Sequence, residues 1–208
     1  MKKTKTHDLV LYATYGALIF VARTLDHLVS GFLPINFAII TLTVALSCAL
    51  LIPTLKNCVI AGFVFGVMSL LTALMFGGGA VVYGMVNPLI SVLPRVIVGF
   101  VAFISFTLSY RLLQKVTAKK KAFMLSSSIA CVFSAITNTI TVLSMIWLFK
   151  TIEGIDALYV IFTVNAIPEL IVPALIAPFL IYAVRNSMKI KDAYAQEPLD
   201  KNGRGGEK

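Results

Sequence analysis

Charged residues are scarce in this sequence, and long stretches lack them altogether. Asp, Glu, Lys and Arg make up only 13% of the 208 residues, whereas a typical soluble domain has about a quarter. No charged residue occurs in residues 28–55, 57–94 or 122–149. A helix needs roughly 20 mostly apolar residues to cross a bilayer. The missing charges therefore exclude an ordinary soluble domain and predict an all-α, polytopic membrane protein.

The sequence also has little of what an enzyme or a metal protein needs. The two histidines, His7 and His27, lie near the ends of predicted spans and form no metal-binding pair with each other or with a Glu. No Gly-x-Ser-x-Gly nucleophile motif and no Walker A motif occur, so any ATP must be used by another chain. The cysteines lack metal-like spacing, which favours small buried side chains at Cys48, Cys58 and Cys131. We expect no catalysis, no cofactor and no metal.

Turn-forming residues divide the apolar sequence into six segments. Prolines, glycines and short basic turns separate predicted helices at about residues 8–25, 35–53, 57–77, 87–116, 121–149 and 157–185. The basic start of the chain resembles a signal peptide, but it lacks a small-x-small cleavage site before Arg23, so we expect the first helix to be retained. We expect a six-helix transmembrane domain over residues 1–187 and a polar, disordered tail over residues 188–208.

Basic residues are distributed unevenly between the two ends of the predicted helices. If both termini share one side, that side receives 15 of the 18 Lys and Arg residues, and only Arg23, Arg95 and Lys150 fall elsewhere. Because basic residues favour the cytoplasmic side, this distribution predicts that the N- and C-termini are both cytoplasmic. The same distribution accounts for the net charge of +9 without a nucleic-acid partner.

Three polar residues lie deep inside predicted spans. At 1.5 Å per residue, Arg95, Asn138 and Glu169 lie about 12, 16 and 18 Å from the outer ends of their helices. Asn165 precedes Glu169 by one turn on the same face, and Asn87 stands at the start of the fourth helix. Ionisable residues inside a membrane usually face a cavity or a partner. The set predicts either an outward-opening cavity in which Arg95 binds an anionic group, or an Arg95–Glu169 ion pair that only fixes helix packing.

Small residues gather on two of the predicted helices. Ala13, Gly16 and Ala17 form a patch on the first helix, with the two alanines one turn apart on one face. Gly62 and Gly66 form a similar pair on the third helix. Small residues allow another helix to approach closely, within the chain or from a partner.

Several motifs occur in an order that resembles one family. The segments "NPLISVLPRVIVGFVA" (87–102), "ITNTITVL" (136–143) and "NAIPELIVPALIAPFLI" (165–181) resemble the substrate-binding (S) components of energy-coupling factor (ECF) transporters, in the branch of the folate and pantothenate subunits. The resemblance covers most of residues 8–185. It implies a six-helix protein of the bacterial cell membrane that captures a vitamin from outside. Its implied partners are a transmembrane coupling subunit and two cytoplasmic ATPase subunits.

The resemblance also implies roles for particular residues. The family's Ala-x-x-x-Ala coupling motif corresponds to Ala13 and Ala17, which with Gly16 would dock on the coupling subunit. Substrate contacts in the family imply a ligand site formed by Asn87, Arg95, Asn138, Asn165 and Glu169. The planar fork of an arginine suits a carboxylate, so pantothenate and folate are both candidate substrates.

Other functions stay open from the residues alone. Arg95 and Glu169 fit a proton-coupled pair, as in a stand-alone secondary transporter driven by a proton gradient. A membrane enzyme and a purely structural membrane protein are further alternatives. Coexpression separates the first two functions, because an ECF subunit transports only when its ATPases are present.

Overall fold

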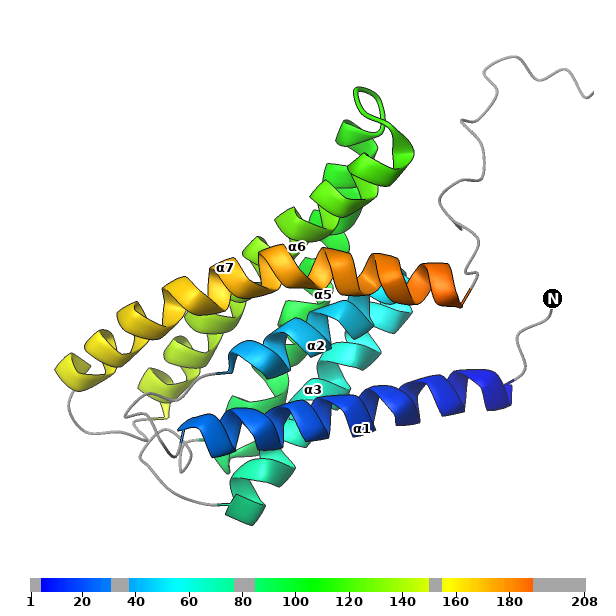
Figure 1. Ribbon diagram of the computed structural model, residues 1–208. Coiled ribbons are helices and arrows are strands. Elements are labelled where there is room, and N and C mark those ends of the chain that lie inside the picture. The colour runs from blue at the N-terminus through cyan, green and yellow to red at the C-terminus, as the bar shows by residue number, and fades with distance from the viewer. Residues whose placement is uncertain (1–4, 31–37, 77–84, 150–154, 189–208) are drawn as a thin grey trace, which may run out of the picture.

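The computed structural model is an all-α protein with six described helices (Figure 1). It describes residues 5–30, 38–76, 85–149 and 155–188, and side chains in 9–29, 38–76, 85–149 and 166–188. The helices are α1 (Lys5–Ser30), α2 (Ile39–Leu51), α3 (Leu55–Phe76), α5 (Pro88–Leu113), α6 (Lys119–Leu148) and α7 (Ile155–Ser187). Each predicted helix overlaps one of these, so the all-α prediction is confirmed. The predicted tail lies, apart from residue 188, outside the described residues.

Five of the described helices are long and apolar enough to cross a membrane. The candidate spans are Leu9–Val29, Leu55–Phe76, Pro88–Leu113, Lys119–Leu148 and Ala166–Ser187. Large apolar side chains cover the outside of the bundle: Leu108, Ile167 and Phe179 are each more than 60% exposed. An apolar surface of this extent is unfavourable in water but matches the hydrocarbon of a bilayer. These are the features of a multi-pass membrane protein.

The helix α2 is shorter than the predicted second span. It has 13 residues, or about 20 Å at 1.5 Å per residue, whereas the hydrocarbon core is about 30 Å thick. The prediction extended this helix to Pro53, but the structure ends it at Leu51. Proline has no N–H to continue the helical hydrogen bonds. The helix α2 is therefore about 10 Å shorter than the hydrocarbon core.

Side chains of neighbouring helices bind the carbonyl groups at the end of α2. The Asn57 side chain on α3 donates to the carbonyl oxygens of Cys48 (3.2 Å) and Ala49 (3.0 Å). Arg185 on α7 donates to the carbonyl of Leu51 at 2.9 Å. The last carbonyls of a helix have no partner within it, and leaving them unsatisfied in an apolar environment costs several kcal/mol. These contacts allow a short helix to end inside the bundle.

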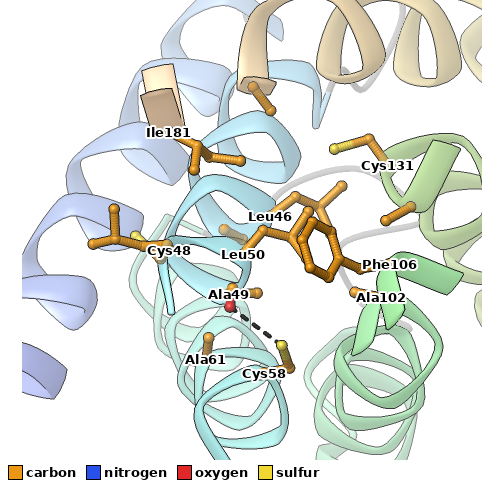
Figure 2. Packing of buried hydrophobic residues seen from close by; sticks show 14 of the residues in the cluster. Leu46, Cys48, Ala49, Leu50, Cys58, Ala61, Ala102, Phe106, Cys131 and Ile181 are labelled. Atoms are coloured by element: carbon orange, nitrogen blue, oxygen red, sulfur yellow. Dashed lines mark hydrogen bonds between the residues drawn. The ribbon is translucent and has the colours of Figure 1, made fainter. Parts of the chain in front are cut away.

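The core of the protein is built around α2, which contacts every other helix of the described part. Figure 2 shows Leu46 and Leu50 of α2 packed close to Phe106 and Ala102 of α5, with Ile181 of α7 on the other side. All five side chains are buried. The three cysteines are buried and free, as the sequence predicts.

The helices α3 and α5 cross in backbone contact. A Cβ atom added to Gly62 of α3 would lie 2.3 Å from the carbonyl oxygen of Arg95, and one added to Gly66 would lie 2.7 Å from the Cα of Val92. A Cβ atom on Gly99 of α5 would lie 2.3 Å from the α3 backbone. Only glycine permits this approach. The predicted role of Gly62 and Gly66 in close packing is confirmed, and the crossing fixes the position of Arg95.

The bundle has two distinct ends. The N-terminal end of α1 and the C-terminal end of α7 lie at the same end of the molecule (Figure 1). The first turns of α2, α5 and α7 lie toward the opposite end.

Candidate functional site

The Arg95 side chain is buried inside the bundle and is 3% exposed. Its helix begins at Pro88, and the Asn87 side chain caps this start by accepting a hydrogen bond from the Leu89 N–H at 3.0 Å. Proline is favourable at the first helical position because its fixed φ suits a helix and it has no N–H to satisfy. The guanidinium carbon of Arg95 lies 5.6 Å from the centroid of the Phe65 ring on α3, within the range of a cation–π contact.

The carbonyl of Ile90 binds the Arg95 guanidinium because residue 94 is a proline. In a regular helix the N–H of residue 94 would donate to the carbonyl of residue 90, but proline has no N–H. The Nη1 of Arg95 donates to this carbonyl at 3.0 Å instead. The Nε of the same group is buried without a hydrogen-bond partner. Since a guanidinium has five N–H donors, Arg95 keeps donors for a further acceptor.

The half-buried Glu169 on α7 binds the start of α2. Its Oε1 accepts a hydrogen bond from the N–H of Ala38, the residue before α2, at 3.2 Å. Glu169 and Arg95 interact electrostatically, but within the described side chains no direct ion pair joins them. The structure therefore does not contain the direct Arg95–Glu169 ion pair that the packing interpretation predicted.

A second acid, Asp26 on α1, also holds the start of α2. Its side chain is 2% exposed and accepts hydrogen bonds from the N–H groups of Ile40 (3.1 Å) and Thr41 (2.7 Å) and from the Thr41 hydroxyl. The first N–H groups of a helix have no partner within it, and the partial positive charge there favours an anion. Carboxylates from α1 and α7 therefore supply the N-terminal cap that α2 itself lacks.

Arg23 on α1 completes a group of four charged side chains. Its Nη2 donates to the Sδ of Met85 at 3.5 Å, and a thioether is a weak acceptor. Arg23 interacts electrostatically with Asp26, Glu169 and Arg95. We call Arg23, Asp26, Arg95 and Glu169 the charge cluster, which contains two basic and two acidic side chains.

Sequence reasoning missed two members of this cluster. The first helix was predicted to end at residue 25, which put Asp26 in a loop, but α1 continues to Ser30. The signal was present in "ARTLD", where Arg23 and Asp26 are three residues apart and therefore share one face of an otherwise apolar helix.

The three predicted asparagines have different positions. Asn138 on α6 is 6% exposed, and its Oδ1 is buried without a hydrogen-bond partner, so it has acceptor capacity inside the bundle. Asn87 uses its side-chain oxygen as the cap of α5. Asn165 lies in α7, one turn before Glu169, but its side chain is outside the described part of the structure.

The small-residue patch on α1 is divided between two faces. Ala13 and Ala17 are exposed on the outside of the bundle, whereas Gly16 is buried. A Cβ atom on Gly16 would lie 3.3 Å from the Met68 Cε on α3. The two alanines are therefore accessible from the membrane, and Gly16 packs within the chain.

An apolar groove of about 420 Å³ lies between α1, α2 and α7, along residues 10–18, 44–51 and 180–188. Its lining includes Tyr15, Cys48 and Ile181 but none of the predicted ligand residues. No charged residue of the described part lines the groove, so it offers no cation for an anionic ligand, and the charge cluster remains the candidate site.

A comparison with known proteins finds no family model that matches the chain and no curated protein with significant similarity to it.

Proposed function

We propose that this chain is the substrate-binding subunit of an ECF-type importer in a bacterial cell membrane. It captures a vitamin or related small molecule from outside, and a carboxylate-bearing compound such as pantothenate or folate fits best. It delivers this substrate through a shared transmembrane coupling subunit and two ATPase subunits. In this proposal the chain crosses the membrane six times, with α2 as the short crossing and both termini in the cytoplasm. The proposal is supported by the order of the motifs around Arg95, Asn138 and Glu169.

The observation that carries the proposal is the buried Arg95. A permanent positive charge, 3% exposed inside a candidate span, has one hydrogen bond to a backbone carbonyl and a buried Nε without a partner. A charge in such a place is costly unless it serves a ligand, an ion pathway or a partner. A ligand carboxylate is the group that a planar guanidinium binds best, through two parallel hydrogen bonds.

Two further polar residues inside the bundle supply the rest of the proposed binding site. Asn138 offers a buried acceptor to a hydroxyl or amide of the substrate. Glu169 balances the arginine charge electrostatically. Glu169 also accepts a hydrogen bond from the Ala38 N–H. Substrate binding near Glu169 would therefore change the contacts at the start of α2.

Transport is the direct test of this function. Cells that carry the subunit with its coupling module should take up the radiolabelled substrate, and uptake should vanish when the ATPases are inactivated. Binding to the purified subunit should persist in both cases. Full uptake by the subunit alone in vesicles would rule out the ECF assignment.

A stand-alone secondary transporter is the second candidate. The observation in its favour is that Glu169 lies inside the bundle, bonded to a backbone N–H and to no arginine among the described side chains. A carboxylate held in this way can exchange a proton. Reconstituted subunit that accumulates substrate in response to a proton gradient, without ATP, would favour this candidate.

A further inference from the structure

Two arginines from different helices end at the same small group of apolar residues. Arg23 of α1 donates to the Met85 sulfur, and Arg95 of α5 donates to the Ile90 carbonyl. Met85 and Ile90 pack together in one buried cluster, which also contains Ala73, Val142 and Ile146. Both hydrogen bonds therefore end at residues of this cluster, and the two guanidinium groups also interact electrostatically.

The acids near these arginines are already engaged. Asp26 accepts three hydrogen bonds from the start of α2, and the partial positive charge of that helix end offsets its own charge. Glu169 accepts one from the Ala38 N–H. Among the described side chains, neither arginine forms a direct ion pair. Glu169 interacts with both arginines, but one carboxylate does not balance two like charges, which repel each other strongly inside a membrane protein.

Both arginines keep unused donors. The hydrogen bond of Arg23 ends on a thioether sulfur, which is a weak acceptor, and that of Arg95 on a carbonyl. The Nε of Arg95 is buried and has no partner. An oxyanion placed between the two groups would accept charge-assisted hydrogen bonds from both, which are the strong ones.

We propose that Arg23 is a second anion-binding residue and forms, with Arg95, a two-arginine clamp around one carboxylate of the ligand. The inference rests on the proposed function, since it places the clamp at the same binding site. It also narrows the substrate class. Asp26 is balanced by the partial positive charge at the start of α2, so Glu169 and one ligand carboxylate balance the two arginines, and the clamp selects compounds with a single carboxylate over dicarboxylates.

The clamp is tested by ligand-induced stabilisation of the purified full-length chain in detergent. Three matched pairs serve as probes: pantothenate and panthenol, nicotinate and nicotinamide, biotin and biotinamide. Within each pair only the first compound carries a carboxylate. A bound ligand raises the unfolding temperature according to its concentration and Kd. We expect at least one carboxylate to stabilise the wild-type chain more than its neutral partner does.

Substitution of Arg23 then separates binding from folding. In Arg23→Gln we expect the effective carboxylate to bind at least tenfold more weakly, equivalent to about 1.4 kcal/mol, with no change for its neutral partner. Arg23→Lys keeps the charge without the planar fork and should lose part of the affinity, which provides a measurement if the Gln variant does not fold. Arg111→Gln, at an exposed position of α5, is the matched control and should bind normally.

Three outcomes would overturn the clamp. One is a wild-type chain that no carboxylate stabilises more than its neutral partner. Another is an Arg23→Gln variant that unfolds at a lower temperature but keeps the full preference for the carboxylate, because Arg23 is then only structural. The third is a dicarboxylate such as folate that binds more tightly than every monocarboxylate. Failure of ATP-driven uptake with the clamp intact would instead refute the importer function alone.

Discussion

The Arg95 guanidinium donates to the backbone carbonyl of Ile90, five residues earlier on the same helix, at 3.0 Å. This carbonyl lacks its usual helical donor because residue 94 is proline. The Leu-Pro-Arg sequence therefore removes one N–H from the helix and supplies a charged donor in its place. A segment apolar enough to cross a membrane can hold a permanent charge in this way without leaving that carbonyl unsatisfied.

Pro94→Ala tests this local arrangement. The new N–H of residue 94 would donate to Ile90 and compete with Arg95, so the guanidinium would lose its fixed position. We expect unchanged or higher thermal stability, since proline inside a helix is unfavourable, together with roughly three- to tenfold weaker binding of a carboxylate ligand. Isothermal titration on the purified protein measures the affinity. Pro178→Ala, in α7, is the control and should leave binding unchanged; an equal loss in both variants would contradict the explanation.

Glu169 is expected to tolerate glutamine but not alanine. The amide oxygen of Glu169→Gln still accepts the Ala38 N–H, so the free energy of unfolding should stay close to that of the wild type. Glu169→Ala leaves this N–H without its partner, which costs about 1–3 kcal/mol. Thermal unfolding in detergent compares the two variants. Equal destabilisation of both would mean that the charge of Glu169, and not its hydrogen bond, stabilises the fold.

The helices of this protein follow from local sequence, but the charge cluster does not. Uncharged stretches ended by proline and basic turns locate six helices because these signals act over a few residues. The cap of α2 could not be predicted in this way, since Asp26 and Glu169 are provided by α1 and α7. Their role depends on which helices become neighbours in space. Arg95 and Asn138 could be identified from the sequence because a polar residue inside an apolar helix is costly unless it has a partner or a function. This holds whichever helices are its neighbours.

Asp26→Ala should be among the most destabilising single changes in α1. It removes three accepted hydrogen bonds and leaves two N–H groups of α2 without an acceptor inside the bundle. We expect a loss of about 2–3 kcal/mol in the free energy of unfolding, from the lost cap and the unsatisfied donors. The control Thr41→Val removes only the hydroxyl bond and should cost about 1 kcal/mol. Similar unfolding curves for Asp26→Ala and the wild type would contradict this role.

Gly62→Ala tests the crossing of α3 and α5. The added Cβ would lie 2.3 Å from the carbonyl oxygen of Arg95, so the two backbones must separate. Overpacking of this kind costs about 1–3 kcal/mol or more, which exceeds the 0.5–1 kcal/mol that alanine contributes in a helix. The displaced Arg95 should also bind a carboxylate ligand more weakly. In the control Gly16→Ala the nearest atom is the flexible end of Met68, at 3.3 Å, and both stability and binding should change little.

The exposed alanines of α1 provide a test of partner docking that is independent of the ligand site. Ala13 and Ala17 face outward, where a bulky side chain meets only lipid in the isolated subunit. Ala17→Trp should therefore leave folding and ligand affinity near normal, but it should block the close approach of a partner helix. We expect at least tenfold less complex with the coupling module in a pull-down, and a matching loss of ATP-driven uptake. Ile104→Trp, at an exposed position of α5, carries the same bulk on another surface and should assemble normally. If Ala17→Trp assembles as well as Ile104→Trp does, the partner docks on a different face of the subunit.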